Sequence, residues 1–534
     1  MRASWFRFVC RNVTRTRRGV HDRGQLMPDR HGGSVRPFRA RDHAQIVAAV
    51  AGLLLVSNAC ATNPVTGDRE FVLMSEAQEI SLGREADAQI QRDMGLYSDP
   101  GIQRYVEEIG LSLAALSHRP DLPWQFAVVD SPAVNAFALP GGFIYLTRGI
   151  LAYLGDEAEL AGVLGHEIGH VTARHAVQSY TRASGAQLGL VLGQVFVPQM
   201  GPNAYGLPGL TDAASTGLGL LFLKFGRDDE IQADRLGAEY GLAGGWHPAG
   251  VADMLSTLGR ISEAADRQGT PNFLSTHPEP EARVLEIAPV IQELTADRDP
   301  ATLRVDRSAY LDRIEGLLFG DNPEDGIVRG SEFLHPPLRF ALEFPEGWGV
   351  RNNPSVVVAQ EPGAEVYVLL QLAENPRGNN LSSIAEQEMR DSGYRLRSGG
   401  EASINGLDAY IGTYVGQADG VGEVTARVAH IRHGQELYVL GGLGPSESFS
   451  RVESDINRSI RSFRPLSRAE AESILPNEIA TYVARPGDTW QSIAQADGEE
   501  IVNARTLAIM NGSPVNEQPQ PGDRLKIVVA GGGR

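Results

Sequence analysis

The sequence predicts a chain of several domains rather than one. Its 534 residues, with a hydrophobic fraction of 42%, are enough to bury more than one core. Helical periodicity dominates residues 60–300, and alternating strand patterns dominate 331–466. We therefore expect a mainly α-helical domain with a small edge hairpin, then an α+β domain, then a third, small domain over residues 481–530. Residues 301–330 are predicted to be a connector, 467–480 a linker and 531–534 a tail.

The stretch from Asp156 to His175 is the strongest helix signal in the chain. Asp156 can cap its first turn, and Glu159 follows three residues later, as in a capping box. No proline interrupts the stretch. One face should be buried, because apolar residues recur at helical spacing: Leu160, Val163, Leu164, Ile168 and Val171.

This helix carries a possible metal-binding motif, H-E-x-x-H. Residues four apart lie on one face of a helix, so His166 and His170 can reach the same zinc ion. Glu167 follows the first histidine directly, which in the helical zinc-protease motif puts its carboxylate beside metal-bound water as general base.

A catalytic zinc needs a third protein ligand and one open position. His175 is the nearest candidate, but Ala173 and Ala176 stand where a metzincin would need Gly and His, so we expect an ordinary polar residue near the helix end. Glu230 is the better candidate. Asp234 lies four residues further on the same predicted helix face and could accept the ring N–H of a ligating histidine.

These motifs resemble peptidase family M48, whose members are zinc endopeptidases related to the CAAX prenyl protease. The resemblance rests on H-E-I-G-H followed by E-x-x-A-D about sixty residues later. Three further stretches match: Asn63-Pro-Val-Thr-Gly67 with Leu73-Met-Ser75 and Glu79 to Gly83, then Asn135-Ala-Phe-Ala-Leu-Pro-Gly-Gly142, then His277-Pro-Glu-Pro-Glu-Ala-Arg283. Together they extend from about residue 63 to 290.

The resemblance implies a zincin-type (gluzincin) domain that holds one zinc ion through His166, His170 and Glu230. It also implies that an edge strand binds the extended backbone of the substrate. That strand would comprise Asn135, Ala136, Phe137 and Ala138. The alternative is a buried hairpin without substrate contact.

His277 lies in a proline-bounded loop rather than on a helix with the other ligands. The motif match favours a catalytic role for it. It could donate to the oxyanion of the tetrahedral intermediate, or occupy the fourth zinc position in a resting state. The alternative is a purely structural role, in which His277 stabilises the loop. Arg283 could hold this loop or contact the substrate.

The N-terminal region is expected to be a leader. The chain has a net charge of −18, but residues 1–43 carry eleven Arg and three Asp, a local +8 that leaves −26 for the rest. An acidic body argues against nucleic acid as a partner. The apolar run 44–56 is too short for a membrane span and suits a signal peptide over residues 1–59. Met27 is a candidate for the true start.

Cys60 resembles the lipidated cysteine of a lipobox. Ser57 stands where Leu or Val is usual, so ordinary cleavage after Ala59 is the alternative. Cys10 is the only other cysteine, which leaves Cys60 without a partner for a disulfide after processing. Lipidation therefore explains it best, and we expect an anchor in the outer membrane.

Residues 180–224 are rich in Gly, Ala and Leu, and their apolar runs are shorter than a membrane span. We expect a helical hairpin or lid over the cleft, with contact to a membrane or partner as the alternative.

Residues 331–466 alternate between strands and sparse helices. The hairpin Phe344-Pro-Glu-Gly-Trp348 weakly resembles the opening of PsbP-like domains. His430 and His433 lack a companion with metal-ligand spacing, so we expect both at the surface. No catalytic constellation is present, and a binding or docking module is expected.

Residues 482–528 resemble a LysM module, on Arg485-Pro-Gly-Asp-Thr-Trp490, Asn511 and Pro521-Gly-Asp-Arg-Leu-Lys-Ile527. Ala484 stands where valine is usual. The resemblance implies a β-α-α-β fold that binds glycans containing N-acetylglucosamine, such as peptidoglycan. The alternative is a degenerate copy that only packs on its neighbours.

Together these features predict a zinc endopeptidase on the periplasmic side of a bacterial envelope, and the resemblance to family M48 implies a role in protein quality control. Its expected partners are unfolded or misassembled envelope proteins as substrates, peptidoglycan, and a membrane through Cys60. A peptidoglycan-binding scaffold and a wall hydrolase remain alternatives.

Overall fold

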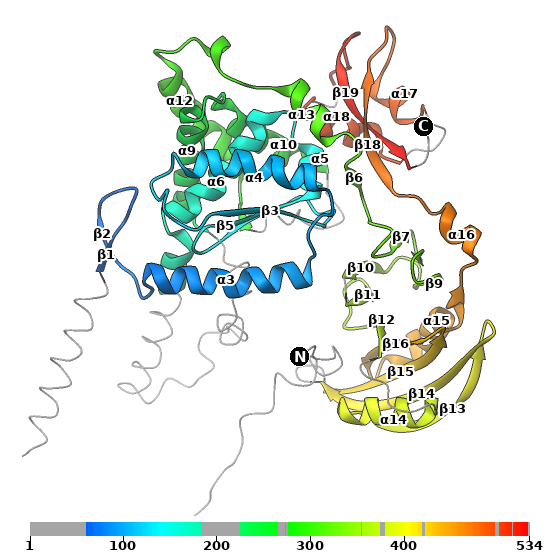
Figure 1. Ribbon diagram of the computed structural model, residues 1–534. Helices are drawn as coiled ribbons and strands as arrows, with labels where there is room; N and C mark the ends of the chain where they lie inside the picture. Colours follow the sequence, from blue (N-terminus) through cyan, green and yellow to red (C-terminus); the bar gives the residue numbers. More distant parts are fainter. Residues whose placement is uncertain are drawn as a thin grey trace, which may run out of the picture. The chain divides into compact units, whose positions relative to one another are not determined.

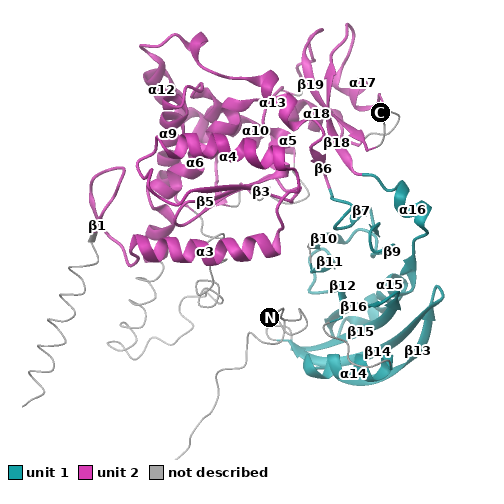
Figure 2. Cartoon of the chain, viewed as in Figure 1, with its two compact units in different colours: residues 1–44, 321–475 teal, residues 45–320, 476–534 magenta. Residues whose placement is uncertain are grey.

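The structure, a computed structural model, describes residues 60–182, 225–264, 273, 276–353, 355–373, 380–418, 422–496, 501–514 and 516–531. The chain forms two compact units, coloured separately in Figure 2. Unit 2 contains residues 45–320 and 476–534, and the described residues of unit 1 lie within 321–475. The predicted leader 1–59 and most of the predicted lid 180–224 lie outside the described residues. A helical domain followed by a β-rich region is confirmed.

Unit 2 is built around a three-stranded sheet in the order β3-β5-β4. β3 (Gln125–Val129) runs parallel to β5 (Phe143–Thr147), and β4 (Ala136–Leu139) pairs antiparallel with β5. β4 is therefore an edge strand of the described sheet.

Helices cover both faces of this sheet (Figure 1). The hairpin of β1 (Cys60–Thr62) and β2 (Arg69–Phe71) leads into α3 (Glu76–Asp93), which packs on one face. α4 (Pro100–Ala114) and α6 (Glu157–Thr172) cover the other face. Alternate side chains of the strands divide between the two cores. Those facing α3 are Val129, Phe137, Leu139, Phe143 and Tyr145.

α6 lies at the centre of unit 2, and all but one of its sixteen residues are buried. It follows α5 (Arg148–Tyr153) and begins as predicted, with the Asp156 side chain accepting from Glu159 N at 2.9 Å. The reciprocal half of the predicted capping box is wrong. Glu159 is buried and its carboxyl interacts with the backbone of Gly155, one residue before the cap.

α9 (Arg227–Ala243) lies beside α6 because small residues meet where the helices cross. A Cβ on Gly237 would lie 2.9 Å from His166 N, and one on Gly165 would lie 2.9 Å from Gly237 Cα. Only glycine permits this approach. α10 (Ala249–Ala264) and α12 (Pro280–Thr295) complete the bundle.

The segment after α12 joins the same core. η2 (Pro300–Thr302) precedes α13 (Arg307–Ile314), and β6 (Leu318–Phe319) pairs with β18 (Asn477–Val483). α17 (Trp490–Ala494), α18 (Ala504–Met510) and β19 (Arg524–Ala530) follow, and β18 and β19 are antiparallel. The predicted β-α-α-β order is confirmed, whereas the LysM identity stays a prediction. Ile479 and Met510 belong to the core cluster that also holds the apolar residues of α6.

Unit 1 is an antiparallel seven-stranded sheet in the order β10-β11-β12-β16-β15-β14-β13, with α15 packed on one face and α14 on the other. A four-stranded sheet, β17-β9-β8-β7, accompanies it. The bounds are β7 Ile327–Arg329, β8 Glu332–His335, β9 Phe340–Glu343, β10 Gly349–Asn353, β11 Val356–Gln360, β12 Tyr367–Leu372, α14 Leu381–Asp391, β13 Arg395–Ile404, β14 Leu407–Ala418, β15 Gly422–His433, β16 Glu436–Pro445, α15 Phe449–Ser462, β17 Arg464–Pro465 and α16 Arg468–Ser473.

One expectation for unit 1 needs correction. The surface position predicted for His430 is wrong: its side chain is fully buried and Nε2 lies 3.2 Å from Glu388 Oε2. Both faces of β15 are covered, so a polar residue on this strand is not necessarily exposed to solvent. Within the described ranges, no helix combines the length and apolarity needed to cross a membrane.

Candidate metal centre

Four side chains from three segments of unit 2 converge on one point. Their ligand atoms lie within 4.8 Å of one another, and all four residues are buried: His166, His170, Glu230 and His277. The Nε2 atoms of His166 and His170 are 3.0 Å apart, one helical turn from each other on α6. Glu230 on α9 places Oε1 3.4 Å from His170 Nε2 and Oε2 3.7 Å from His166 Nε2.

His166 is oriented from behind by a carboxylate. Its Nδ1 lies 2.9 Å from Asp234 Oδ1, the position predicted from the spacing of the two acidic residues on α9. Arg283 on α12 donates to Asp234 through Nε at 2.8 Å and Nη2 at 2.6 Å. Its Nη1 lies 2.6 Å from Glu230 Oε2, an ion pair that lacks hydrogen-bond geometry. Arg283 is thus buried against two carboxylates, and its predicted contact with substrate stays a prediction.

His277 reaches the cluster from the start of the loop before α12. Its backbone N–H donates to Phe273 O, and the two rings stack with centroids 4.4 Å apart. Nδ1 lies 3.0 Å from Glu230 Oε1, and Nε2 lies 3.6 Å from Glu167 Oε1. Burial alone would lower the pKa of His277, but the carboxylates of Glu230 and Glu167 outweigh it and raise the pKa.

Glu167 has the surroundings of a general base. Its Oε1 is buried and has no hydrogen-bond partner among the described residues. Burial raises the pKa of its carboxyl, partly offset by His277 and His166. A carboxylate whose pKa is moved toward neutrality is suited to accept and return a proton.

The donor set fits zinc. Ligands must be a neutral imidazole or an ionised carboxylate. Burial holds the pKa of His170 well below its ordinary value, which keeps the ring neutral. Burial would raise the pKa of Glu230, but His277 and His170 outweigh it and hold the pKa well below its ordinary value. Two histidines and one glutamate form a known ligand set of catalytic zinc.

His175 lies just past the end of α6, near the helix end as expected, and it is not one of the four clustered residues. It is fully buried, because the chain turns at Arg174 with φ 60° and the helix resumes at His175. Its Nδ1 lies 2.9 Å from His170 Nδ1, on the opposite side of that ring from the ligand cluster. Its Nε2 lies 2.9 Å from Gln232 Oε1. The sequence reasoning missed Gln232, although it lies between Glu230 and Asp234.

Of the residues predicted to bind substrate, Ala136, Phe137 and Ala138 lie in the edge strand β4, and Asn135 directly precedes it. Asn135 O accepts from Thr147 N at 3.0 Å, so Asn135, Phe137 and Leu139 form the hydrogen-bonded pairs with β5. The N–H and C=O groups of Ala136 and Ala138 therefore point away from β5. The Asn135 side chain also offers a buried Oδ1 without a partner among the described residues.

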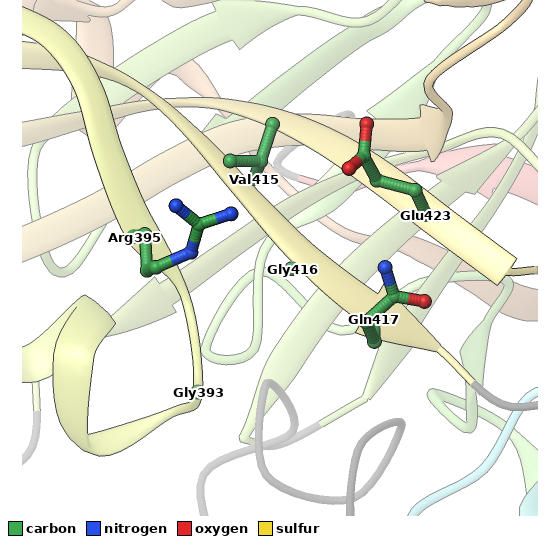
Figure 3. A pocket seen from close by; sticks show the side chains of 6 residues that line it. All are labelled: Gly393, Arg395, Val415, Gly416, Gln417 and Glu423. Atoms are coloured by element: carbon green, nitrogen blue, oxygen red, sulfur yellow. The ribbon is translucent and has the colours of Figure 1, made fainter.

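A separate pocket of about 220 Å³ lies in unit 1, where Arg395, Gln417 and Glu423 face one another across β13, β14 and β15 (Figure 3). It shares no residue with the histidine cluster, and we assign it no function.

The helix-borne histidines, Glu230 from a second helix and the buried carboxylate of Glu167 define a zinc metalloendopeptidase. Residues 100–290 match the model of Peptidase family M48. The predicted enzyme class and zinc cofactor are confirmed.

Curated relatives agree with this assignment. The Beta-barrel assembly-enhancing protease of Yersinia pestis is 26% identical over 364 residues, which cover 65% of this chain and 73% of that protein. The protein of the same name from Escherichia coli (strain K12) is 29% identical, over 42% of this chain and 46% of its own length. The mitochondrial metalloendopeptidase OMA1 of Arabidopsis thaliana is 33% identical, over 39% of this chain and 40% of its own length. The last two matches span less than half of those relatives.

The solution structure of cyanobacterial PsbP (CyanoP) from Synechocystis sp. PCC 6803 is 13% identical, covers 26% of this chain and 95% of that chain, and has a TM-score of 0.21. A likeness this weak supports no argument about fold or function, so the PsbP-like reading of residues 331–466 stays a prediction.

Proposed function

We propose that this protein hydrolyses peptide bonds of unfolded or misassembled proteins on the periplasmic side of a bacterial envelope. The observation that carries the proposal is the convergence of His166, His170 and Glu230 beside the buried carboxylate of Glu167, whose Oε1 accepts no hydrogen bond from the described residues. The names of the relatives from Yersinia pestis and Escherichia coli support envelope proteins as the substrate class. The lipid on Cys60 and the binding of peptidoglycan by residues 481–530 belong to the proposal too.

Substrate would bind as an added strand. The outward N–H and C=O groups of Ala136 and Ala138 can pair with an extended peptide, as an exposed sheet edge does in β-augmentation. Asn135 could accept a further backbone N–H through its Oδ1. An unfolded segment meets this requirement and a folded domain does not, which favours unfolded proteins as substrates.

His166, His170 and Glu230 would hold the zinc ion, which supplies Lewis-acid chemistry by lowering the pKa of water and polarising the scissile carbonyl. Glu167 takes a proton from the attacking water and later gives it to the leaving amine. Asp234, held by Arg283, keeps the His166 ring in one orientation.

His277 has two candidate roles, and one variant separates them. As a donor to the oxyanion, its loss in His277→Ala should lower kcat about a hundredfold while zinc affinity stays unchanged. As a fourth ligand of a resting state, its loss should lower zinc affinity and raise activity. Its Nδ1 lies among the ligand atoms while Nε2 faces Glu167, so both roles are sterically open.

The decisive experiment compares the purified full chain with its Glu167→Gln variant on unfolded casein, with the zinc content of both measured. We expect the variant to retain zinc and to lose at least about a hundredfold in rate. Equal rates would refute the role of Glu167. If neither protein cleaves while both hold zinc, the assignment as an active peptidase is refuted under these conditions. Release of soluble muropeptides from purified cell walls, without casein cleavage, would favour the wall hydrolase instead.

A further inference from the structure

The ring of His175 bridges one zinc-ligand histidine and the neighbouring helix. Its Nδ1 lies 2.9 Å from His170 Nδ1, and its Nε2 lies 2.9 Å from Gln232 Oε1. The His175 side chain is fully buried. The next polar atom near Nε2, Asp229 Oδ1, lies farther away at 3.9 Å. His175 therefore has one close partner on each side.

The direction of these two hydrogen bonds follows from the chemistry of the Gln232 side-chain amide. The carbonyl oxygen of an amide can only accept, so Nε2 of His175 carries its proton and donates to Gln232. In a neutral imidazole the other nitrogen is then an acceptor. His170 must donate from its Nδ1, which leaves the lone pair of His170 Nε2 for the metal.

Local structure holds this arrangement in place. Arg174 adopts a left-handed backbone conformation, which costs a residue with a side chain about 1–2 kcal/mol. Its side chain compensates by contacting Glu79 Oε2 at 3.2 Å and Met74 O at 2.9 Å. This turn directs His175 back beneath α6. Phe225 stacks on the His170 ring with centroids 4.1 Å apart and limits its rotation.

We propose that His175 and Gln232 are positioning residues, which fix the tautomer and ring orientation of His170 for metal binding. The inference rests on the proposed zinc site and deepens it. The two histidines on α6 are then supported in different ways. His166 relies on a carboxylate neutralised by Arg283, whereas His170 relies on a chain of uncharged groups that ends in an amide.

The test measures zinc affinity by competition with a chromogenic chelator, and ligand geometry by the visible spectrum of the cobalt(II)-substituted protein. Gln232→Met keeps the length of the side chain but lacks an acceptor, whereas Gln232→Glu retains one. Outer partners of a ligating histidine typically account for about 10–100-fold in metal affinity. We expect His175→Ala to lose affinity in that range, Gln232→Met to lose about tenfold, and Gln232→Glu to bind within about threefold of wild type.

We call the hydrogen-bonded series from His170 through His175 to Gln232 the relay. The double variant His175→Ala with Gln232→Met distinguishes an effect of this relay from a general loss of packing. Because Gln232 acts through His175, the double variant should bind zinc no more weakly than His175→Ala alone. Thr172→Val is the matched control, since it removes a buried hydrogen bond to Tyr240 from the same helix end without touching the relay. It should keep wild-type affinity and spectrum.

Equal zinc affinity and identical cobalt spectra in wild type, Gln232→Met and Gln232→Glu would overturn the proposal. Should His175→Ala fail to fold, the two Gln232 variants still decide the outcome. The His166→Ala variant distinguishes failure of the proposed metal site from failure of the relay. If His166→Ala binds zinc as tightly as wild type, the proposed metal site is wrong. If His166→Ala loses zinc while the His175 and Gln232 variants do not, only the relay is refuted.

Discussion

The ammonium group of Lys526 on β19 donates a hydrogen bond to the backbone carbonyl of Leu154, two residues before the N-cap of α6. Lys526 is fully buried. Arg307 adds a second link, donating to Gly155 O at 2.7 Å and approaching Asn511 Oδ1 at 3.4 Å. The β-α-α-β module is thereby joined to the N-terminal end of the helix that carries His166 and His170.

Replacing Lys526 with Ala should destabilise unit 2. The change leaves a cavity and a carbonyl without a donor, which together should cost at least about 2 kcal/mol. Urea denaturation, followed by the fluorescence of the tryptophans, measures the free energy of unfolding. Arg505→Ala on the exposed face of α18 is the control and should change little. Equal stability of the Lys526 variant and wild type would show that the link is dispensable.

The buried carboxyl of Glu159 should make the stability of the protein depend on pH. Burial, with a smaller contribution from the charge of Asp156, raises the pKa of its carboxyl from 4.5 to about 8. Between these values the folded protein keeps a proton that the unfolded chain releases, so stability falls as pH rises. Lys526 acts in the opposite sense at higher pH, since burial lowers its pKa to about 7.

Glu159→Gln should therefore remove part of the fall in stability between pH 5 and pH 7. The free energy of unfolding of wild type minus that of the variant should decrease steadily across this range, as measured by urea denaturation at each pH. A constant difference would mean that Glu159 titrates alike in the folded and unfolded chain.

Arg283→Met should leave two buried carboxylates without their cation. Breaking a buried charge pair typically costs about 3–5 kcal/mol, and we expect zinc affinity to fall as well because Asp234 is no longer held. Arg227→Met is the matched control. It breaks an exposed pair with Glu286 between the same two helices, which is worth about 0–1 kcal/mol. Similar losses in both variants would contradict the role given to Arg283.

Proline substitutions in the edge strand β4 test whether substrate pairs with it. Ala138→Pro removes an N–H that points away from β5, so the sheet should tolerate it while cleavage of casein falls about tenfold or more by loss of substrate pairing. Phe137→Pro removes an N–H in the ladder with β5 and should lower the melting temperature instead. Unchanged cleavage by a folded Ala138→Pro protein would exclude substrate addition at this position.

The contact between α6 and α9 predicts opposite effects of two glycine substitutions. Gly237→Ala places a Cβ 2.9 Å from His166 N and should destabilise the protein by about 1–3 kcal/mol and weaken zinc binding. Gly241→Ala on the same helix meets nothing within 4 Å and should be neutral or stabilising by up to about 1 kcal/mol. Differential scanning calorimetry and chelator competition measure both. Equal effects would refute the close approach of the helices.

Helical spacing was sufficient to place His166 beside His170, and Glu230 one turn from Asp234, because neighbours along a helix are set by local geometry. The same local rules predicted the N-cap at Asp156 and the strand-rich character of residues 331–466. They could not place His277, because a loop position says nothing about which side chains it approaches.

The remaining relationships depend on tertiary packing. His175 was expected only as a polar residue near the helix end, and the turn at Arg174 brings it against Gln232, 57 residues away. Lys526 and Leu154 are 372 positions apart. Contacts at such separations arise from helix crossings and domain packing, which periodicity and spacing along one segment do not encode. The local pattern therefore supplied the donors of the metal centre, and only the folded chain decided what surrounds and orients them.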